Sequence, residues 1–379
     1  MSEILLSTIA PRDVKDATVR RFADDVGDIM KLEVLQAVGA QQAGRTVSFA
    51  PAPPQLANVR MPAGYALNTV GAAVQRYVAT LPAPRRQQLA RNLNVTPRLA
   101  AVRQRLAIDT MAPTYVLGQG NLAPHVGPLL TPAFLQNLGA RLHEAASQLA
   151  VPQNGSSGSH IAVNQGVRLE LVTVKCVDDT DTRLFGLGKD TIDFGGVATD
   201  ANGHSSRIRQ FRVGDFLRGH TQSYSPPRPL HAYSFGNGPY PRMYTALIAI
   251  AEINAVGFAD LLHDLYDAVR DEITVLAGAL GQGAAVAVAG GLGAPTVGGL
   301  AGGTVGDVFA AIVAVVMDDL VAFIIGALQD SLFEPQLVTI TLPDQYAKFD
   351  NGSLVSPNIA TTFADFGGNY RVKYRWVLQ

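Results

Sequence analysis

The 379-residue chain holds a single cysteine, Cys176, so no disulfide can form within it. Cys176 sits in an alternating apolar stretch, where we expect it to be a small buried hydrophobe. A lack of disulfides fits both a reducing compartment and export. The first ten residues lack the basic start and the long apolar run of a standard secretory signal. Localisation therefore stays open between the cytoplasm and export by a non-standard route.

The familiar catalytic motifs are also missing. The sequence contains no Gly-x-Ser-x-Gly, His-Glu-x-x-His or Cys-x-x-Cys, and its seven histidines show no metal-ligand spacing. The stretch Gly186–Thr191 lacks the first glycine and the following helix of a phosphate loop. We expect a non-enzymatic protein with no identifiable small-molecule substrate, while a catalytic site assembled only in space stays open.

Charged residues make up only 16% of the chain, and they are unevenly distributed. Residues 1–150 carry 15 Lys and Arg against 9 Asp and Glu, whereas residues 151–379 carry 15 against 22. Such asymmetry is typical of an anionic partner or of a basic half that docks on an acidic half. We favour docking, within the chain or between copies, over nucleic acid. The candidate anion-binding residues are Arg85, Arg86, Arg91, Arg103 and Arg105.

The first 150 residues have mostly helical patterning. Apolar residues recur with helical spacing over 11–40, 66–81, 84–94, 97–107 and 132–149, with a proline-rich segment at 41–65. Residues 151–160 are rich in Gly and Ser, which bury little apolar area, and we place a domain boundary there. The sequence predicts an Arg-rich helical region over 1–150 and a second domain over 161–379.

After the linker the hydrophobic period changes to two. Apolar residues alternate from Val167 to Leu171 and again from Val172 to Cys176, a change of phase that a β-bulge would cause. Asn202-Gly203 favours a hairpin turn, and the prolines of 226–229 favour a loop or an edge strand. Further strands are expected at 190–199, 207–213, 221–224, 231–235, 244–253, 337–342, 359–363 and 370–378. The fold class is therefore α+β, with a C-terminal antiparallel β-sandwich.

A helical insert at about 258–330 interrupts the strands. It begins with an amphipathic helix over 258–272, whose acidic face holds Asp260, Asp264, Asp267 and Asp271. Residues 273–306 contain no charge and eleven glycines, and an apolar run follows from Val308 to Leu328. His263 on the acidic face adds the residue types of a metal site, although a solvated helix face is the favoured interpretation.

The Gly/Ala-rich insert carries the main functional hypothesis. Two apolar stretches hinged near Pro295 each approach the roughly 20 residues that cross a bilayer. Gly298, Gly302 and Gly306 allow close helix contact, and protonation of Asp318 and Asp319 would reduce the cost of insertion. In this organisation the chain resembles pore-forming bacterial toxins and effectors. The alternatives are a buried helical hairpin or a subunit interface.

An acidic stretch suggests a third possibility. Asp178, Asp179, Asp181 and Asp190 lie between two expected strands, and this arrangement resembles the calcium-binding loops of C2-type sandwiches. A second Asp-rich loop is missing, and a solvated turn explains the same residues. The leading hypothesis is a membrane-active protein, with membrane lipid as the partner. The alternatives are an assembly protein forming a homo-oligomer through its insert and Arg-rich half, and a Ca²⁺- or glycan-binding sandwich module.

Overall fold

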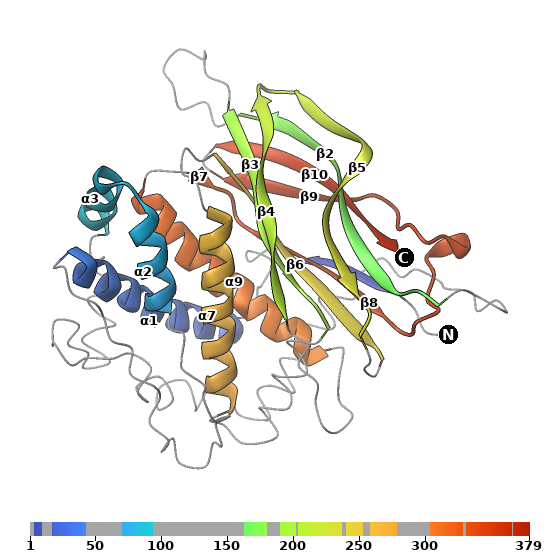
Figure 1. Ribbon diagram of the computed structural model, residues 1–379, viewed down its shortest axis with the longest axis horizontal. Helices are drawn as coiled ribbons and strands as arrows, with labels where there is room; N and C mark the ends of the chain where they lie inside the picture. The colour runs from blue at the N-terminus through green and yellow to red at the C-terminus, as the bar shows by residue number, and fades with distance from the viewer. Residues whose placement is uncertain are drawn as a thin grey trace.

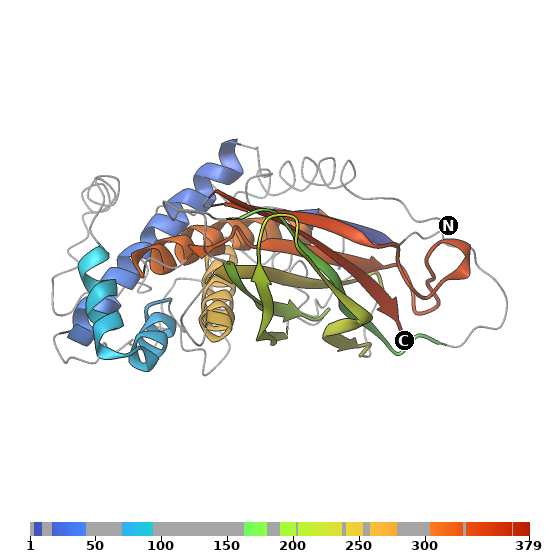
Figure 2. The same ribbon diagram turned by 90° about the horizontal axis from the view of Figure 1, so that it is seen from above.

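The computed structural model describes residues 4–9, 17–42, 70–93, 163–179, 190–201, 204–236, 240–252, 258–278, 304–328, 331–365 and 367–379. These residues form helices and two antiparallel sheets, which confirms the mixed class expected from the sequence. In Figures 1 and 2 the helices lie together on one side of the molecule and the sheets on the other. The predicted linker at 151–160 lies outside the described residues, as do the predicted helices at 97–107 and 132–149.

The larger sheet has six strands. Its order is β1 (Leu5–Ile9), β8 (Gln336–Leu342), β6 (Arg242–Glu252), β3 (Asp190–Thr199) and β4 (Ser205–Phe216), and β7 (Ser331–Leu332) also pairs with β6. β6 is apolar and almost entirely buried because it lies in the middle of this sheet. β4 is the last strand of the sheet, so one of its backbone edges has no strand partner among the described residues.

The smaller sheet has four strands in the order β5 (Thr221–Ser234), β2 (Gly166–Asp178), β10 (Gly368–Leu378) and β9 (Ile359–Asp365). β5 is an edge strand, one of the two placements expected for its prolines, since proline cannot donate to a neighbouring strand. It runs unbroken through these prolines, so the two strands predicted at 221–224 and 231–235 are one strand. In β2, Leu171 and Thr173 face consecutive residues of β10, which leaves Val172 as the extra residue of a bulge. The bulge expected from the change of hydrophobic phase is therefore confirmed.

One apolar core draws side chains from both sheets. Phe194 of β3 and Tyr244 of β6 belong to it together with Tyr370, Tyr374 and Trp376 of β10. Cys176 is part of the same core and is buried, as expected. The opposite face of the six-stranded sheet contributes side chains, among them Val197, Leu247 and Leu337, to a second core that is made mostly by helices. This sheet therefore packs against apolar side chains on both faces.

Five of the helices that the structure describes belong to the helical side. They are α1 (Ala17–Gln42), α2 (Val70–Thr80), α3 (Ala83–Asn92), α7 (Phe258–Gly278) and α9 (Thr304–Ala327). α1 contacts α2 and α9, while α7 contacts α2, α9, β3 and β4. Helices from both halves of the sequence thus build one core. The N-terminal strand β1, which pairs with β8, is not among the sequence predictions.

Candidate functional site

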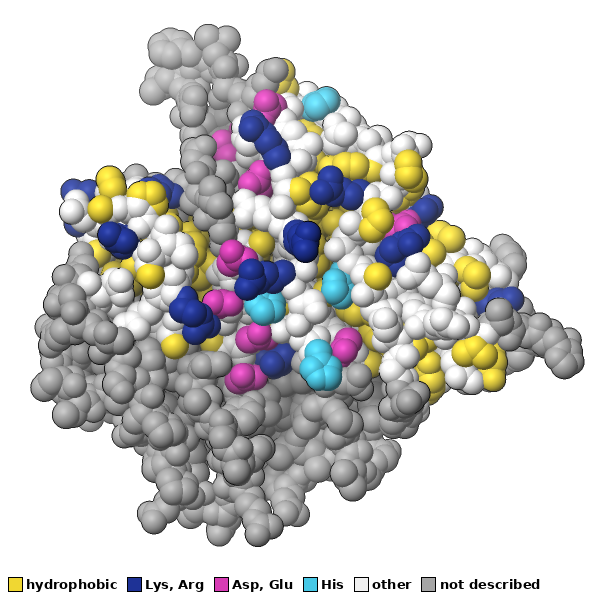
Figure 3. Space-filling view, viewed as in Figure 1, with side chains coloured by type: hydrophobic (Ala, Val, Ile, Leu, Met, Phe, Trp, Pro, Cys, Tyr) yellow, Lys and Arg dark blue, Asp and Glu magenta, His cyan; other side chains and the backbone are white. Residues whose placement is uncertain are grey.

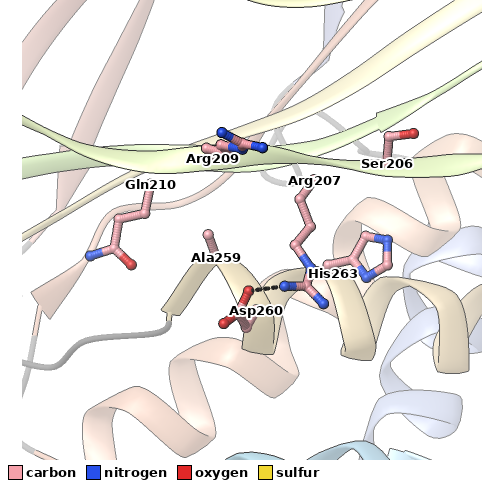
Figure 4. Close-up of a pocket in the computed structure, with 7 residues that line it drawn as sticks. All are labelled: Ser206, Arg207, Arg209, Gln210, Ala259, Asp260 and His263. Carbon is pink, nitrogen blue, oxygen red and sulfur yellow. Dashed lines mark hydrogen bonds and ion pairs between the residues drawn. The ribbon is translucent and has the colours of Figure 1, made fainter.

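A polar groove runs between β4 and the first half of α7 (Figure 4). Its volume is about 600 Å³, and its lining consists of Ser206, Arg207, Arg209, Gln210, Ala259, Asp260 and His263. In Figure 3, charged side chains and histidines gather near the middle of the face that is viewed. We call this feature the β4–α7 groove.

Glycine at position 195 of β3 lets α7 approach the sheet. A Cβ atom at Gly195 would lie 3.1 Å from Cζ of Phe258 and 3.3 Å from Cβ of Ala259. Both contacts are at the first residues of α7, so the start of the helix rests directly on the strand. Ala259 therefore becomes part of the groove instead of being held away from it.

A bulge in β4 shapes the wall of the groove. Gly196 pairs with Ile208 and Phe194 with Phe211, so Gly195 alone faces two residues of β4, Arg209 and Gln210. Bulges of this kind redirect side chains and are frequent at sheet edges and beside functional sites. The Gln210 amide donates a hydrogen bond to Asp193 Oδ2 at 2.6 Å, which anchors one of the two redirected side chains.

The arginines of the groove differ in their partners. Arg207 reaches from β4 to α7 and pairs with Asp260, as Figure 4 shows. Arg209 lies beside the strand and has no ion pair with any residue that the structure describes. The lining holds two arginines and one aspartate, so its formal charge is +1 with His263 neutral. Among the described residues, Arg209 therefore carries the positive charge of the groove that no ion pair compensates.

A hydrogen-bonded cluster lies at one end of the groove. The Ser205 hydroxyl donates to Asp267 Oδ1, while His263 Nε2 lies 3.4 Å from Ser205 Oγ and 3.6 Å from Asp267 Oδ2. His263 Nδ1 lies 3.5 Å from Asp264, whose other oxygen accepts a hydrogen bond from Arg76. The hydrogen bond with His263, aided by Arg76, lowers the pKa of Asp264 below its ordinary value.

The cluster contains the residue types of a Ser-His-Asp triad, but its geometry differs from one. In a triad the serine proton points to the imidazole, which removes it as a general base. Here the Ser205 hydroxyl donates to Asp267 instead. The arrangement therefore ties β4 to α7 and leaves Ser205 without activation by His263. Within the described ranges, no group of three or more His, Cys, Asp or Glu side chains could hold a metal ion.

α9 places Asp318 and Asp319 in different surroundings. Lys31 Nζ of α1 lies 2.5 Å from Asp319 Oδ2. Burial, together with the charges of Glu334, Asp319 and Asp365, raises the pKa of Asp318 to about 7, with Arg20 acting in the opposite direction. Gly306 lies in the first turn of α9, while Gly298 and Gly302 lie outside the described residues.

A glycine also permits the close contact between α1 and α9. A Cβ atom at Gly27 would lie 2.7 Å from Asp319 Oδ2, so any other residue there would push the carboxylate away from Lys31. Lys31 additionally lies 3.6 Å from the buried Asp28 of its own helix. Lys31 therefore forms ion pairs with two carboxylates where α1 crosses α9.

Side chains of α3 hold the C-terminal end of α9. Arg85 and Gln88 donate to the carbonyl of Leu328 at 2.8 and 3.0 Å, and Asn92 donates to the carbonyl of Ala327 at 2.8 Å. The last carbonyls of a helix have no partner within it, so these bonds cap α9 from another helix. We call this set the α3 clamp.

The other arginines predicted to bind anions do not take part in the α3 clamp. Arg86 donates to the carbonyl of Leu81, and Arg91 lies in the last turn of α3. Arg103 and Arg105 lie outside the described residues. The structure thus places three of the five on one helix, and anion binding by them stays a prediction.

The candidate calcium ligands lie on two sheets. Asp178 at the end of β2 is 3.5 Å from Arg218, and Asp190 at the start of β3 accepts a hydrogen bond from the Tyr370 hydroxyl at 2.5 Å. Burial, together with the hydrogen bond to Asp190, raises the pKa of Tyr370. Asp179 is described and half-buried, whereas Asp181 lies outside the described residues. The calcium site stays a prediction.

Comparison with protein-family models, with curated proteins and with solved structures found no match. Among the helices that the structure describes, none is long and apolar enough to cross a membrane. The functional argument therefore depends on the geometry of the groove, the burial of α9 and the contacts that hold α9 in place.

Proposed function

We propose that the chain is a non-enzymatic, membrane-associating protein that stores an apolar segment within its helical side. The observation that carries this proposal is the burial of the apolar run of α9. From Ile312 to Leu328, only Asp318, Asp319, Ala322, Phe323 and Gly326 are more than slightly exposed. A helix that is apolar around most of its circumference is typical of a protein core or of a membrane element.

The proposed membrane element is larger than α9. It comprises residues 273–327, because the sequence joins two apolar stretches near Pro295. No described helix is by itself long and apolar enough to cross a membrane. Storage requires that the soluble form cover these side chains. In support, α9 contacts α1, α3, α7, β7 and β8, and its apolar residues belong to the core shared by the helices and the larger sheet.

Two sets of polar interactions are candidates for the restraint on release. The Lys31–Asp319 pair joins the middle of α9 to α1, and the α3 clamp holds its end. Polar groups that separate on release can bind water instead, whereas the apolar surface requires a new apolar environment. A lipid surface would supply that environment.

The pKa of Asp318 refines the pH-dependent version of the hypothesis. Because this pKa is raised to about 7 in the folded protein, protonation of Asp318 stabilises the packed state and does not by itself release α9. A neutral Asp318 also lowers the cost of entry into lipid. Mild acid therefore lowers the free-energy cost of inserting the segment into a membrane. Release of α9 from the folded protein depends on the Lys31–Asp319 pair and the α3 clamp.

Burial within one chain favours storage over the assembly alternative, since side chains already covered by α1 and α7 are not free to form a subunit interface. We also propose that the two sheets form a β-sandwich that carries the recognition surface, supported by the core they share. On this proposal the protein acts as a bacterial toxin or secreted effector. A calcium- or glycan-binding sandwich module remains the alternative.

Vesicles test the proposal directly. Dye-loaded liposomes with anionic lipid are incubated with the protein at about pH 4.5 and 7.5, which bracket the protonation of its carboxylates. We expect binding and dye release, with more release in acid because neutral carboxylates enter lipid at lower cost. A protein that neither floats with the liposomes nor releases dye at either pH would contradict the proposal.

A further inference from the structure

The edge of β4 that faces no described strand and the β4–α7 groove together offer a binding surface. β3 pairs with one side of β4, and no described strand pairs with the other. Alternate backbone N–H and C=O groups of an edge strand point outward, where an extended peptide can add as a further strand. The groove lies along the same part of β4, at residues 206–210.

The side chains along this edge favour a particular partner. Arg207 and Arg209 line the groove, while Ile208 between them is buried in the core that both sheets share. Side chains directly opposite in neighbouring strands interact, and opposite charges stabilise such pairs. A strand beside β4 would thus place acidic side chains near the arginines and apolar side chains near the core.

Of the two arginines, Arg209 is the one whose charge no described residue compensates. Arg207 is paired with Asp260, and the acidic residues further along α7 have partners of their own, Arg76 for Asp264 and Arg270 for Asp267. Arg209 has no ion pair within the described part of the chain and is exposed. Its planar guanidinium is suited to bidentate hydrogen bonding with a carboxylate.

We propose that the β4–α7 groove binds an extended peptide segment with alternating acidic and apolar residues, added as a strand to the free edge of β4. This inference depends on β4 and α7 alone and not on the release of α9. A failure of membrane binding therefore leaves it standing, and its own failure leaves the membrane proposal standing.

The first experiment measures binding of a capped, fluorescein-labelled decapeptide of alternating Glu and Val by fluorescence anisotropy. The matched probe replaces each Glu by Gln, which keeps the strand propensity and removes the charge. We expect at least about tenfold weaker binding of the Gln probe, since charge pairs across an interface supply specificity. Equal affinity for both probes, or no binding of the acidic one, would overturn the proposal.

Variants locate the site. Arg209→Glu reverses the charge of Arg209, and we expect it to weaken binding of the acidic probe by about tenfold or more. Arg371→Glu is the control, because Arg371 is an exposed arginine on β10, in the other sheet, and undergoes the same change of charge. Equal losses for the two variants, or no loss for Arg209→Glu, would place the peptide elsewhere.

N-methylation tests whether the peptide adds as a strand. Two versions of the acidic probe carry N-methyl groups on alternate residues, each blocking the N–H groups of one strand edge. Strand addition predicts that one version loses binding and the other keeps it, since only one edge faces β4. Equal binding of both versions would contradict strand addition.

Discussion

Cys176 shows how burial controls the chemistry of one residue. Burial raises the pKa of its thiol to about 11, and the hydrogen bond with Tyr370 lowers it only in part. Since the thiolate is the reactive form, we expect no reaction of the folded protein with Ellman's reagent near neutral pH. Val177→Cys, an exposed neighbour on the same strand, is the control and should react at once. A Cys176 that reacts as fast as this control would contradict its burial.

Asp318 makes a prediction about pH. Its pKa in the folded protein, about 7, lies above the unfolded value near 3.9, so its ionisation costs stability as the pH rises through this range. Asp318→Asn should stabilise the protein by roughly 2 kcal/mol at about pH 8 and by little at about pH 4, a difference that urea unfolding measures. Asp319→Asn, which loses the ion pair with Lys31, should not stabilise. A gain from Asp318→Asn that is equal at both pH values would refute this assignment.

The sequence predicted the burial or conformation of single residues only where that property follows from a local pattern. The burial of Cys176 and the bulge at Val172 follow from alternation along one strand. The Lys31–Asp319 pair joins positions that nothing local relates, and the cluster of Ser205 with His263 and Asp267 depends on how α7 crosses β4. Contacts of this kind arise from packing, which the hydrophobic period of one segment does not encode.

Two glycines in regular elements should respond in opposite directions. A Cβ atom added at Gly39 of α1 would meet nothing within 4 Å, so Gly39→Ala should stabilise the protein by about 0.5–1 kcal/mol through helix propensity. A Cβ atom at Gly196 would lie 2.2 Å from the Leu247 carbonyl oxygen, so Gly196→Ala should destabilise it by about 2 kcal/mol or more. Thermal unfolding of both variants tests this, and the same sign for both would contradict the packing of β3 against β6.

The α3 clamp makes a prediction about the end of α9. Asn92→Ala and Arg85→Ala each remove a donor to a terminal carbonyl and should cost about 1 kcal/mol. Hydrogen exchange should accelerate in the last turns of α9, because the uncapped end frays more often. Gln87→Ala, an exposed position on α3, is the control. Unchanged exchange in both clamp variants would show that α3 does not hold α9.

At the level of elements, prediction succeeded where a pattern was long and regular. α1, α2, α3 and α7 lie close to their predicted ranges, as do β2, β3, β4, β6, β8, β9 and β10, since their apolar periods extend over many residues. β5 is one strand where two were predicted, and the two-residue strand β7 was not predicted. β1 was missed because five residues give little periodicity and its partner β8 lies at the other end of the chain. Which strands share a sheet was likewise beyond a single sequence, because pairing is non-local.

At the scale of the whole molecule, the sequence singled out 308–328 as the anomalous run, and α9 is at the centre of the helical core. The amino-acid composition does not indicate which elements cover this helix. The structure adds that α1, from the other end of the chain, does so through the close crossing at Gly27 and Asp319. The Arg-rich half contributes the α3 clamp to the same core, which gives one of its arginines a structural role.

A disulfide between α1 and α9 tests stored membrane activity most directly. The Cβ position at Gly27 lies 3.9 Å from Cβ of Asp319, within the span of about 3.5–4.5 Å that disulfides adopt. The double variant Gly27→Cys/Asp319→Cys therefore locks α9 when oxidised and frees it when reduced, with Asp319→Cys alone as the redox control. We predict that the oxidised protein leaves dye-loaded liposomes intact, whereas the reduced protein releases their contents. Equal release from the two forms, including none from either, would contradict the account.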